Sequence, residues 1–171
     1  MEKAGKEFLD QWRSMGSPLV IAACTSCLEV FRKELPEVRA VSLWSVLQEK
    51  GVPEVFPLRS VSMALHDPCT TRSLPAWRTA VRDILRALGQ PFEELSMTGE
   101  TTRCCGYGGL QSLVDPDLAE KGVRRRLGES DKDFLAYCAM CRESLSDSGK
   151  PVAHLLDLFF PPAAPYEAVG F

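Results

Sequence analysis

The chain has 171 residues, of which 45% are hydrophobic and 25% charged, and its formal net charge is -3. This composition is typical of a globular protein with one medium domain or two small ones, and it excludes a disordered chain. The charge gives no reason to expect nucleic acid as a partner, and no apolar run approaches the roughly 20 residues of a membrane-spanning helix.

The first part of the chain alternates between helix and strand patterns. Apolar residues at helical spacing, among them Phe8 and Trp12, predict an amphipathic helix over residues 2–15. The apolar run at 18–23 predicts a short buried strand. Before residue 66 we further expect helices at 25–35 and 42–50 and a strand at 61–65.

The second part continues this alternation. Residues 74–88 show the strongest helix pattern, with Pro75 in the first turn and Trp77 and Val81 on one apolar face. The three arginines at 124–126 are expected on a solvated helix face. The other expected segments are a loop at 96–112, a helix at 117–127, a strand at 134–137, helices at 138–145 and 152–160, and a flexible tail at 161–171.

Strands that alternate with helices predict an α/β fold with a Rossmann-like, mainly parallel sheet flanked by helices. In such folds, ligands bind at the carboxyl ends of the strands. Cys24, Cys69 and Cys138 each follow a predicted strand, and this placement favours a shared site.

An internal similarity divides the chain. Residues 20–29 resemble residues 134–143, and Cys24-x-x-Cys27 matches Cys138-x-x-Cys141, each pair opening a predicted helix. We therefore expect an N-terminal helix plus a partial cysteine-rich repeat at 1–60, a complete cysteine-rich unit at 61–160 and the tail at 161–171.

The cysteine content indicates metal or redox chemistry. The N-terminal residues lack the apolar segment of a secretory signal, so a cytoplasmic location is expected. Seven cysteines are many for a protein of a reducing compartment, where clustered cysteines more often bind metal or do redox chemistry than form disulfides.

Five of these cysteines form one ordered pattern: Cys69, the adjacent Cys104 and Cys105, and Cys138-x-x-Cys141. A structural zinc takes four ligands, and so does an ordinary cubane iron–sulfur cluster. Adjacent Cα atoms lie about 3.8 Å apart, below the usual disulfide range of about 4.4–6.8 Å, so the adjacent pair is not expected to bridge. The pattern indicates ligands for more than one metal atom.

Residues beside the cysteines are further candidates. Gly106, in Cys-Cys-Gly-Tyr-Gly-Gly, allows the backbone to approach a bulky inorganic group. His66 and Asp67, in His-Asp-Pro-Cys, are the candidate catalytic or hydrogen-bonding groups, although a structural histidine and a turn-capping aspartate explain them as well. Cys24 and Cys27 either bind metal or are unused thiols of a duplication.

Two other chemistries remain open at this point. A single zinc could bind four of the five thiols and stabilise an interaction module without redox turnover. A metal-free protein could exchange disulfides through its Cys-x-x-Cys, which would leave Cys69, Cys104 and Cys105 unexplained.

The three local motifs, His-Asp-Pro-Cys, Cys-Cys-Gly-x-Gly-Gly and a Cys-x-x-Cys that opens a helix, resemble the CCG-type cysteine-rich domain family over roughly residues 18–160. This domain occurs in heterodisulfide reductase and in the glycolate oxidase iron–sulfur subunit. The resemblance implies that a [4Fe–4S] cluster, non-cubane in the heterodisulfide reductase case, is held by Cys69, Cys104, Cys105, Cys138 and Cys141.

The resemblance also implies a role and partners. The chain would be an iron–sulfur component of an oxidoreductase complex that transfers electrons or reduces a disulfide. Because the sequence has no ferredoxin-type run of closely spaced cysteines, electrons are expected from a ferredoxin-like or flavin subunit or domain. A disulfide or a small organic molecule would be the substrate.

Overall fold

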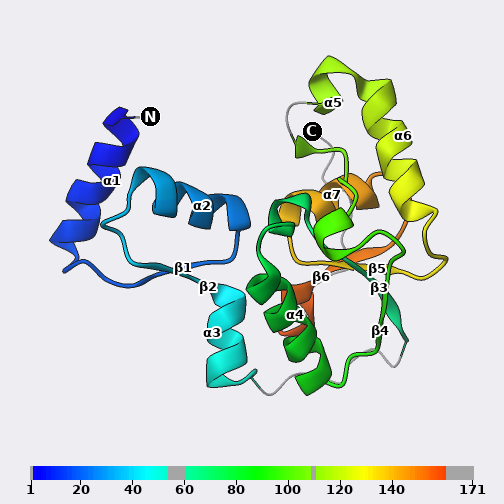
Figure 1. Cartoon of the computed structure of the whole chain (residues 1–171), viewed down its shortest axis with the longest axis horizontal. Coiled ribbons are helices and arrows are strands. Elements are labelled where there is room, and N and C mark those ends of the chain that lie inside the picture. Colours follow the sequence, from blue (N-terminus) through cyan, green and yellow to red (C-terminus); the bar gives the residue numbers. More distant parts are fainter. Residues whose placement is uncertain (1, 54–60, 109–110, 161–171) are drawn as a thin grey trace. The chain divides into compact units, whose positions relative to one another are not determined.

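The computed structural model describes residues 2–53, 61–108 and 111–160. The chain divides into two compact units, Met1–Gly51 and Val52–Phe171. Both units are α/β, with parallel strands and flanking helices, as the sequence predicts, although the strands form two sheets (Figure 1). Within the described ranges, every helix is too short or too polar to cross a membrane.

The first unit is a small βαβα arrangement preceded by a helix. Its elements are α1 (Glu2–Ser14), β1 (Val20–Ala22), α2 (Thr25–Glu34), β2 (Ala40–Ser42) and α3 (Leu43–Lys50). β1 and β2 pair in parallel, with Val20 opposite Ala40. Leu28 and Trp44 are fully buried, so each of the two helices that follow a strand contributes to the core.

The second unit contains a four-stranded parallel sheet in the order β4-β3-β5-β6. The strands are β3 (Met63–His66), β4 (Phe92–Glu94), β5 (Phe134–Ala136) and β6 (Val152–His154). The two central strands, β3 and β5, are buried throughout, as expected for a parallel sheet covered on both faces. The chain passes from β3 to β4 on one side and from β5 to β6 on the other, so the topological switch point lies between β3 and β5.

Helices surround this second sheet (Figure 1). α4 (Pro75–Ala87) begins with proline and buries Trp77, Val81 and Ile84 on one face, as its spacing predicts. α7 (Ala139–Ser146) packs on β5 and β6, and α6 (Pro116–Leu127) packs on α7. Among the described residues, the other helical segments are the short α5 (Gln111–Val114) and the 3-10 turns η1 (Cys69–Thr71), η2 (Gly99–Thr101) and η4 (Leu155–Leu158).

Two sequence-based expectations are wrong. The helix expected at 152–160 is instead β6 followed by η4, because Val152 pairs in parallel with Phe134 and extends the sheet. The solvated face expected at 124–126 holds only in part, because Arg126 is fully buried. β2, β4 and α5 were not expected, and the tail predicted at 161–171 lies outside the described residues.

Candidate metal centre

The candidate site lies at the carboxyl ends of β3 and β5, beside the topological switch point. Cys69 begins η1 shortly after β3 ends at His66. Cys138 is the residue before α7 and follows β5 and Tyr137. The backbone order of the sheet thus brings together two segments that are far apart in the sequence.

The five cysteines of the sequence pattern form one continuous chain of side-chain contacts. Cys69 contacts Cys104, Cys104 contacts Cys105, Cys105 contacts Cys141, and Cys141 contacts Cys138. Cys105 and Cys141 are buried, and the other three are partly buried. All five are free thiols, so the fold gathers five sulfur donors in one place.

Contacts within this chain of thiols shift their pKa values in different directions. Hydrogen bonds from Cys105 and Cys69 hold the pKa of Cys104 far below its ordinary value. A hydrogen bond from Cys141, together with backbone N–H groups at the start of α7, lowers the pKa of Cys138 to about 6 against the effect of burial. The same contacts and burial raise the pKa of Cys141 and Cys69. The lowered pKa values favour the thiolate form at Cys104 and Cys138, and thiolate is the form that binds metal.

Gly106 fits tightly behind the cysteine pair. It has φ +84, and a Cβ at this position would lie 3.0 Å from the backbone oxygen of Ala119 and 3.0 Å from Val123 Cγ2. Its backbone N–H donates to Cys104 Sγ at 3.4 Å. Glycine is therefore required here both by the backbone conformation and by the close approach of α6.

His66 lies beside the innermost sulfurs. One of its ring nitrogens and the Sγ atoms of Cys105 and Cys141 all lie within 4.8 Å of one another. Its Nδ1 accepts a hydrogen bond of 2.8 Å from Arg126 Nε, whereas Nε2 is buried and has no hydrogen-bond partner among the described residues. Burial and the adjacent Arg126 charge lower the pKa of His66 to about 3, so the imidazole is neutral.

Asp67, the other candidate catalytic group, is fully occupied by hydrogen bonds. Arg82 donates to both carboxylate oxygens, at 3.1 and 2.8 Å. Tyr137 donates to Oδ1 at 2.6 Å, and Thr98 and the Gly99 backbone donate to Oδ2 at 2.8 and 3.0 Å. Burial opposes ionisation, but the hydrogen bonds outweigh it and lower the pKa of Asp67 to about 2. Asp67 thus joins four segments around the site.

Cys24 and Cys27 belong to the first unit. Both are exposed, at the start of α2, and they are hydrogen-bonded to each other. Burial and this contact raise the pKa of Cys27. The arrangement repeats the strand, Cys-x-x-Cys and helix of β5 and α7, but with exposed rather than buried sulfurs.

Arg126 is a residue of the site that sequence reasoning missed. Besides His66, its guanidinium donates to the Met97 carbonyl at 2.6 Å and to Glu129 at 3.0 Å. The missed signal is its spacing, because Ala119, Val123 and Arg126 recur on the one buried face of α6. The neighbouring arginines of the basic run hid this pattern.

Residues 63–146 match the family model described as the CCG cysteine-rich domain. This segment contains all five cysteines of the contact chain. It is a CCG cysteine-rich domain.

Several longer proteins are also similar to the chain. A subunit of the dihydromethanophenazine:CoB–CoM heterodisulfide reductase of Methanosarcina barkeri is 31% identical over 149 residues, covering 77% of this chain and 36% of that protein. The glycolate oxidase iron–sulfur subunit of Escherichia coli is 26% identical over 124 residues, covering 70% of this chain and 30% of that protein. An uncharacterized iron–sulfur protein of Methanocaldococcus jannaschii is 25% identical over 155 residues, covering 87% and 31%.

The chain therefore spans about a third of the length of these relatives. It is related to iron–sulfur subunits of oxidoreductases, and both enzymes that the motifs suggested, heterodisulfide reductase and glycolate oxidase, are among the matches. The CCG domain itself lies wholly within the second unit.

The residues at the site fit an iron–sulfur cluster. Thiolates are soft ligands that select iron–sulfur clusters, zinc or Cu(I) over harder metal ions. The five sulfurs exceed the four that one tetrahedral ion takes. One ring nitrogen of His66 lies near the sulfurs of Cys105 and Cys141, and its Nε2 has no partner among the described residues, so a bound group with sulfur acceptors would satisfy it.

Proposed function

We propose that the second unit holds an iron–sulfur cluster of the [4Fe–4S] type, with the non-cubane connectivity that the family resemblance implies. In this proposal it serves as the electron-transfer or disulfide-reducing component of an oxidoreductase. The observation that carries the proposal is the continuous contact chain from Cys69 to Cys138 at the sheet's switch point. The relationship to iron–sulfur subunits supports it.

Each segment around the site has a distinct task in this proposal. Cys69, Cys104, Cys105, Cys138 and Cys141 are the ligands. When bound, the cluster supplies one-electron chemistry. Gly106 lets the backbone pass close to the sulfurs, and its N–H bonds to Cys104 Sγ. Such N–H groups stabilise negative charge on sulfur and so favour the reduced form.

The proposed partner is an electron-donating subunit or domain, ferredoxin-like or flavin-containing. The relatives are named as subunits of oxidoreductases, which supports action within a complex. The substrate class that we propose is a disulfide or a small organic molecule.

The test is the content of iron, zinc and acid-labile sulfide per chain, together with the visible spectrum, in protein purified without oxygen. We expect several irons with matching sulfide and broad visible absorption. Cys105→Ser should lose most of the iron, whereas Cys27→Ser, which changes a thiol of the first unit, should retain it. One zinc without iron or sulfide would overturn the proposal in favour of a structural zinc module.

A metal-free thiol–disulfide exchanger is the third outcome. It would show neither iron nor zinc after purification without oxygen, together with reversible oxidation of two thiols. That result would also overturn the cluster proposal.

A further inference from the structure

The hydrogen bond between Arg126 and His66 decides which nitrogen of the imidazole carries the proton. Arg126 Nε is a donor only, since a guanidinium has no acceptor and does not lose its proton in proteins. It lies 2.8 Å from His66 Nδ1, so Nδ1 must present its lone pair. A neutral imidazole has one N–H, which is therefore on Nε2.

Arg126 is itself held in position. It is fully buried, and its Nη1 atom donates to the Met97 carbonyl and to Glu129 Oε2. Glu129 in turn accepts from the Met97 backbone N–H at 3.1 Å. The guanidinium cannot rotate away from His66 without breaking these contacts, so the tautomer is set by the fold.

This tautomer prevents His66 from acting as a metal ligand, although its position beside Cys105 and Cys141 would otherwise suit one. Ligation through Nδ1 would need the lone pair that Arg126 already occupies. Ligation through Nε2 would move the ring proton to Nδ1, where it would face the N–H of Arg126 across 2.8 Å. Two donors would then oppose each other in a buried position, which is costly.

We propose that His66 is a non-ligating hydrogen-bond donor, whose Nε2–H donates to a sulfur of the bound cluster or to the cluster-bound sulfur of Cys105 or Cys141. The inference rests on the proposed function and assigns His66 the task of stabilising negative charge on sulfur. Arg126 is a positioning residue that acts through His66. The buried Nε2, which lacks a partner in the described part of the chain, is the atom that this bond would satisfy.

The tautomer is tested on the metal-free protein by two-dimensional ¹⁵N–¹H NMR of the imidazole rings. The chain has only two histidines, so spectra of His66→Gln and His154→Asn assign both. We expect an unprotonated Nδ1 and a protonated Nε2 at His66. An Nδ1–H tautomer or an imidazolium would overturn the proposal, and this result does not depend on whether the protein binds a cluster.

The second measurement uses the cluster-loaded protein. His66→Leu removes the donor, and His66→Gln keeps an amide N–H at a similar reach. We expect wild-type iron and sulfide content in both variants. The reduction equilibrium of His66→Leu should become about tenfold less favourable, which is about 59 mV for a one-electron couple, and that of His66→Gln should remain closer to wild type.

Two results on the loaded protein would contradict the donor role. One is loss of iron in His66→Leu with retention of secondary structure by circular dichroism. The other is strong ¹⁴N coupling to the reduced cluster in pulsed EPR of the wild type, since that indicates a directly bound nitrogen. If His66→Leu does not fold, the wild-type NMR and EPR measurements decide the question.

Discussion

Ser144, on α7, donates a hydrogen bond of 2.6 Å to the backbone carbonyl of Cys105. The bond joins α7, which begins directly after Cys138 and carries Cys141, to the loop that carries Cys104 and Cys105. The bond therefore holds the Cys-x-x-Cys segment next to the adjacent cysteine pair, through a hydroxyl and a carbonyl that are not proposed ligands.

Replacing Ser144 with alanine should weaken this connection. We expect Ser144→Ala to lower the free energy of unfolding by about 1 kcal/mol, the usual value of one such hydrogen bond, and to release metal faster to a chelator. Ser148→Ala, at an exposed position after α7, is the matched control and should resemble wild type in urea unfolding. Equal behaviour of the two variants would show that the bond does not hold the loop.

Gly106 and Gly108 offer a second matched pair within one motif. In Gly106→Ala, a Cβ would meet the Ala119 backbone oxygen at 3.0 Å at a positive φ, so we expect a loss of about 2 kcal/mol or more. A Cβ on Gly108 would meet no described atom within 4 Å, so Gly108→Ala should be nearly neutral. Thermal unfolding of the two metal-free variants checks this, and similar melting temperatures would refute the packing argument.

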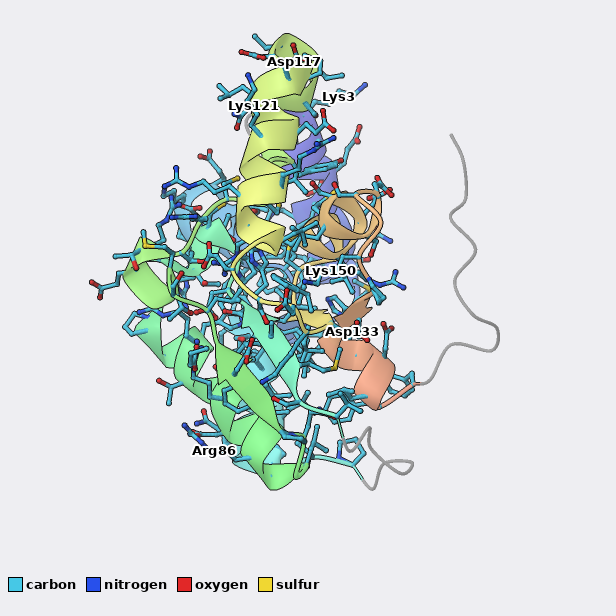
Figure 2. All side chains as sticks on the ribbon, turned by 90° about the vertical axis from the view of Figure 1, so that its right-hand side faces the viewer. Lys3, Arg86, Asp117, Lys121, Asp133 and Lys150 are labelled. Carbon is cyan, nitrogen blue, oxygen red and sulfur yellow. The ribbon has the colours of Figure 1, made fainter. Side chains whose placement is uncertain are left out.

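Arg82 and Arg86 lie on the same helix but in different surroundings. Arg82 is largely buried against Asp67, so Arg82→Met would leave a buried carboxylate without its cation, at a cost of about 3 kcal/mol. Arg86 projects outward (Figure 2) and pairs only with Asp83 among the described contacts, so Arg86→Met should stay within about 0.5 kcal/mol of wild type. Chemical denaturation of both variants at neutral pH measures the two changes in the free energy of unfolding. A small change for Arg82→Met would mean that the buried Asp67 carboxylate does not need the Arg82 cation.

The burial of His154 should make the free energy of unfolding decrease in acid. Burial lowers its pKa, against the effect of Asp157 and with that of Arg142. Above the unfolded pKa of about 6.5 the residue is neutral in both states and adds no pH dependence. As the pH falls below this value, the unfolded chain takes up the proton more readily than the folded one, so stability decreases.

The check is His154→Asn, because asparagine keeps an acceptor for the Leu156 backbone N–H that His154 Nδ1 now serves. The difference in unfolding free energy between wild type and variant should be constant at pH values more than about one unit above the unfolded pKa. At pH values below that pKa, wild type should lose more stability than the variant. If the unfolding free energies of wild type and variant changed in parallel over the whole pH range, His154 would not be the source of the acid sensitivity.

The long, periodic helices and the apolar strands β1, β3 and β5 were predictable from the sequence, whereas the short strands β2, β4 and β6 were not. α4 shows its buried face directly in Trp77, Val81 and Ile84. β4 contains Glu93 and Glu94, which are tolerated because β4 is an edge strand and its carboxylates pair with Lys132 and Arg82. A strand of three residues is too short to show an alternating pattern.

The sequence indicated which cysteines gather at the site, but it did not indicate which residues surround them. The spacing of Cys69, Cys104, Cys105, Cys138 and Cys141 indicated a common site, and the structure places their side chains next to one another. Arg126 and Ser144 could not be found in this way, since both act through contacts with residues far away in the sequence. The ligand role of the cysteines itself stays a prediction.

The hydrogen bonds that converge on Asp67 have a consequence for how the site would be filled. They fasten β3, α4, the turn before Cys104 and the end of β5 with oxygen and nitrogen contacts alone. We therefore expect the framework of the site to keep its shape without metal, unlike a zinc finger, which unfolds when its ion is removed. If the protein binds a cluster, the cluster would therefore be inserted into a site that is already folded. Removal of the cluster should leave the circular dichroism spectrum nearly unchanged.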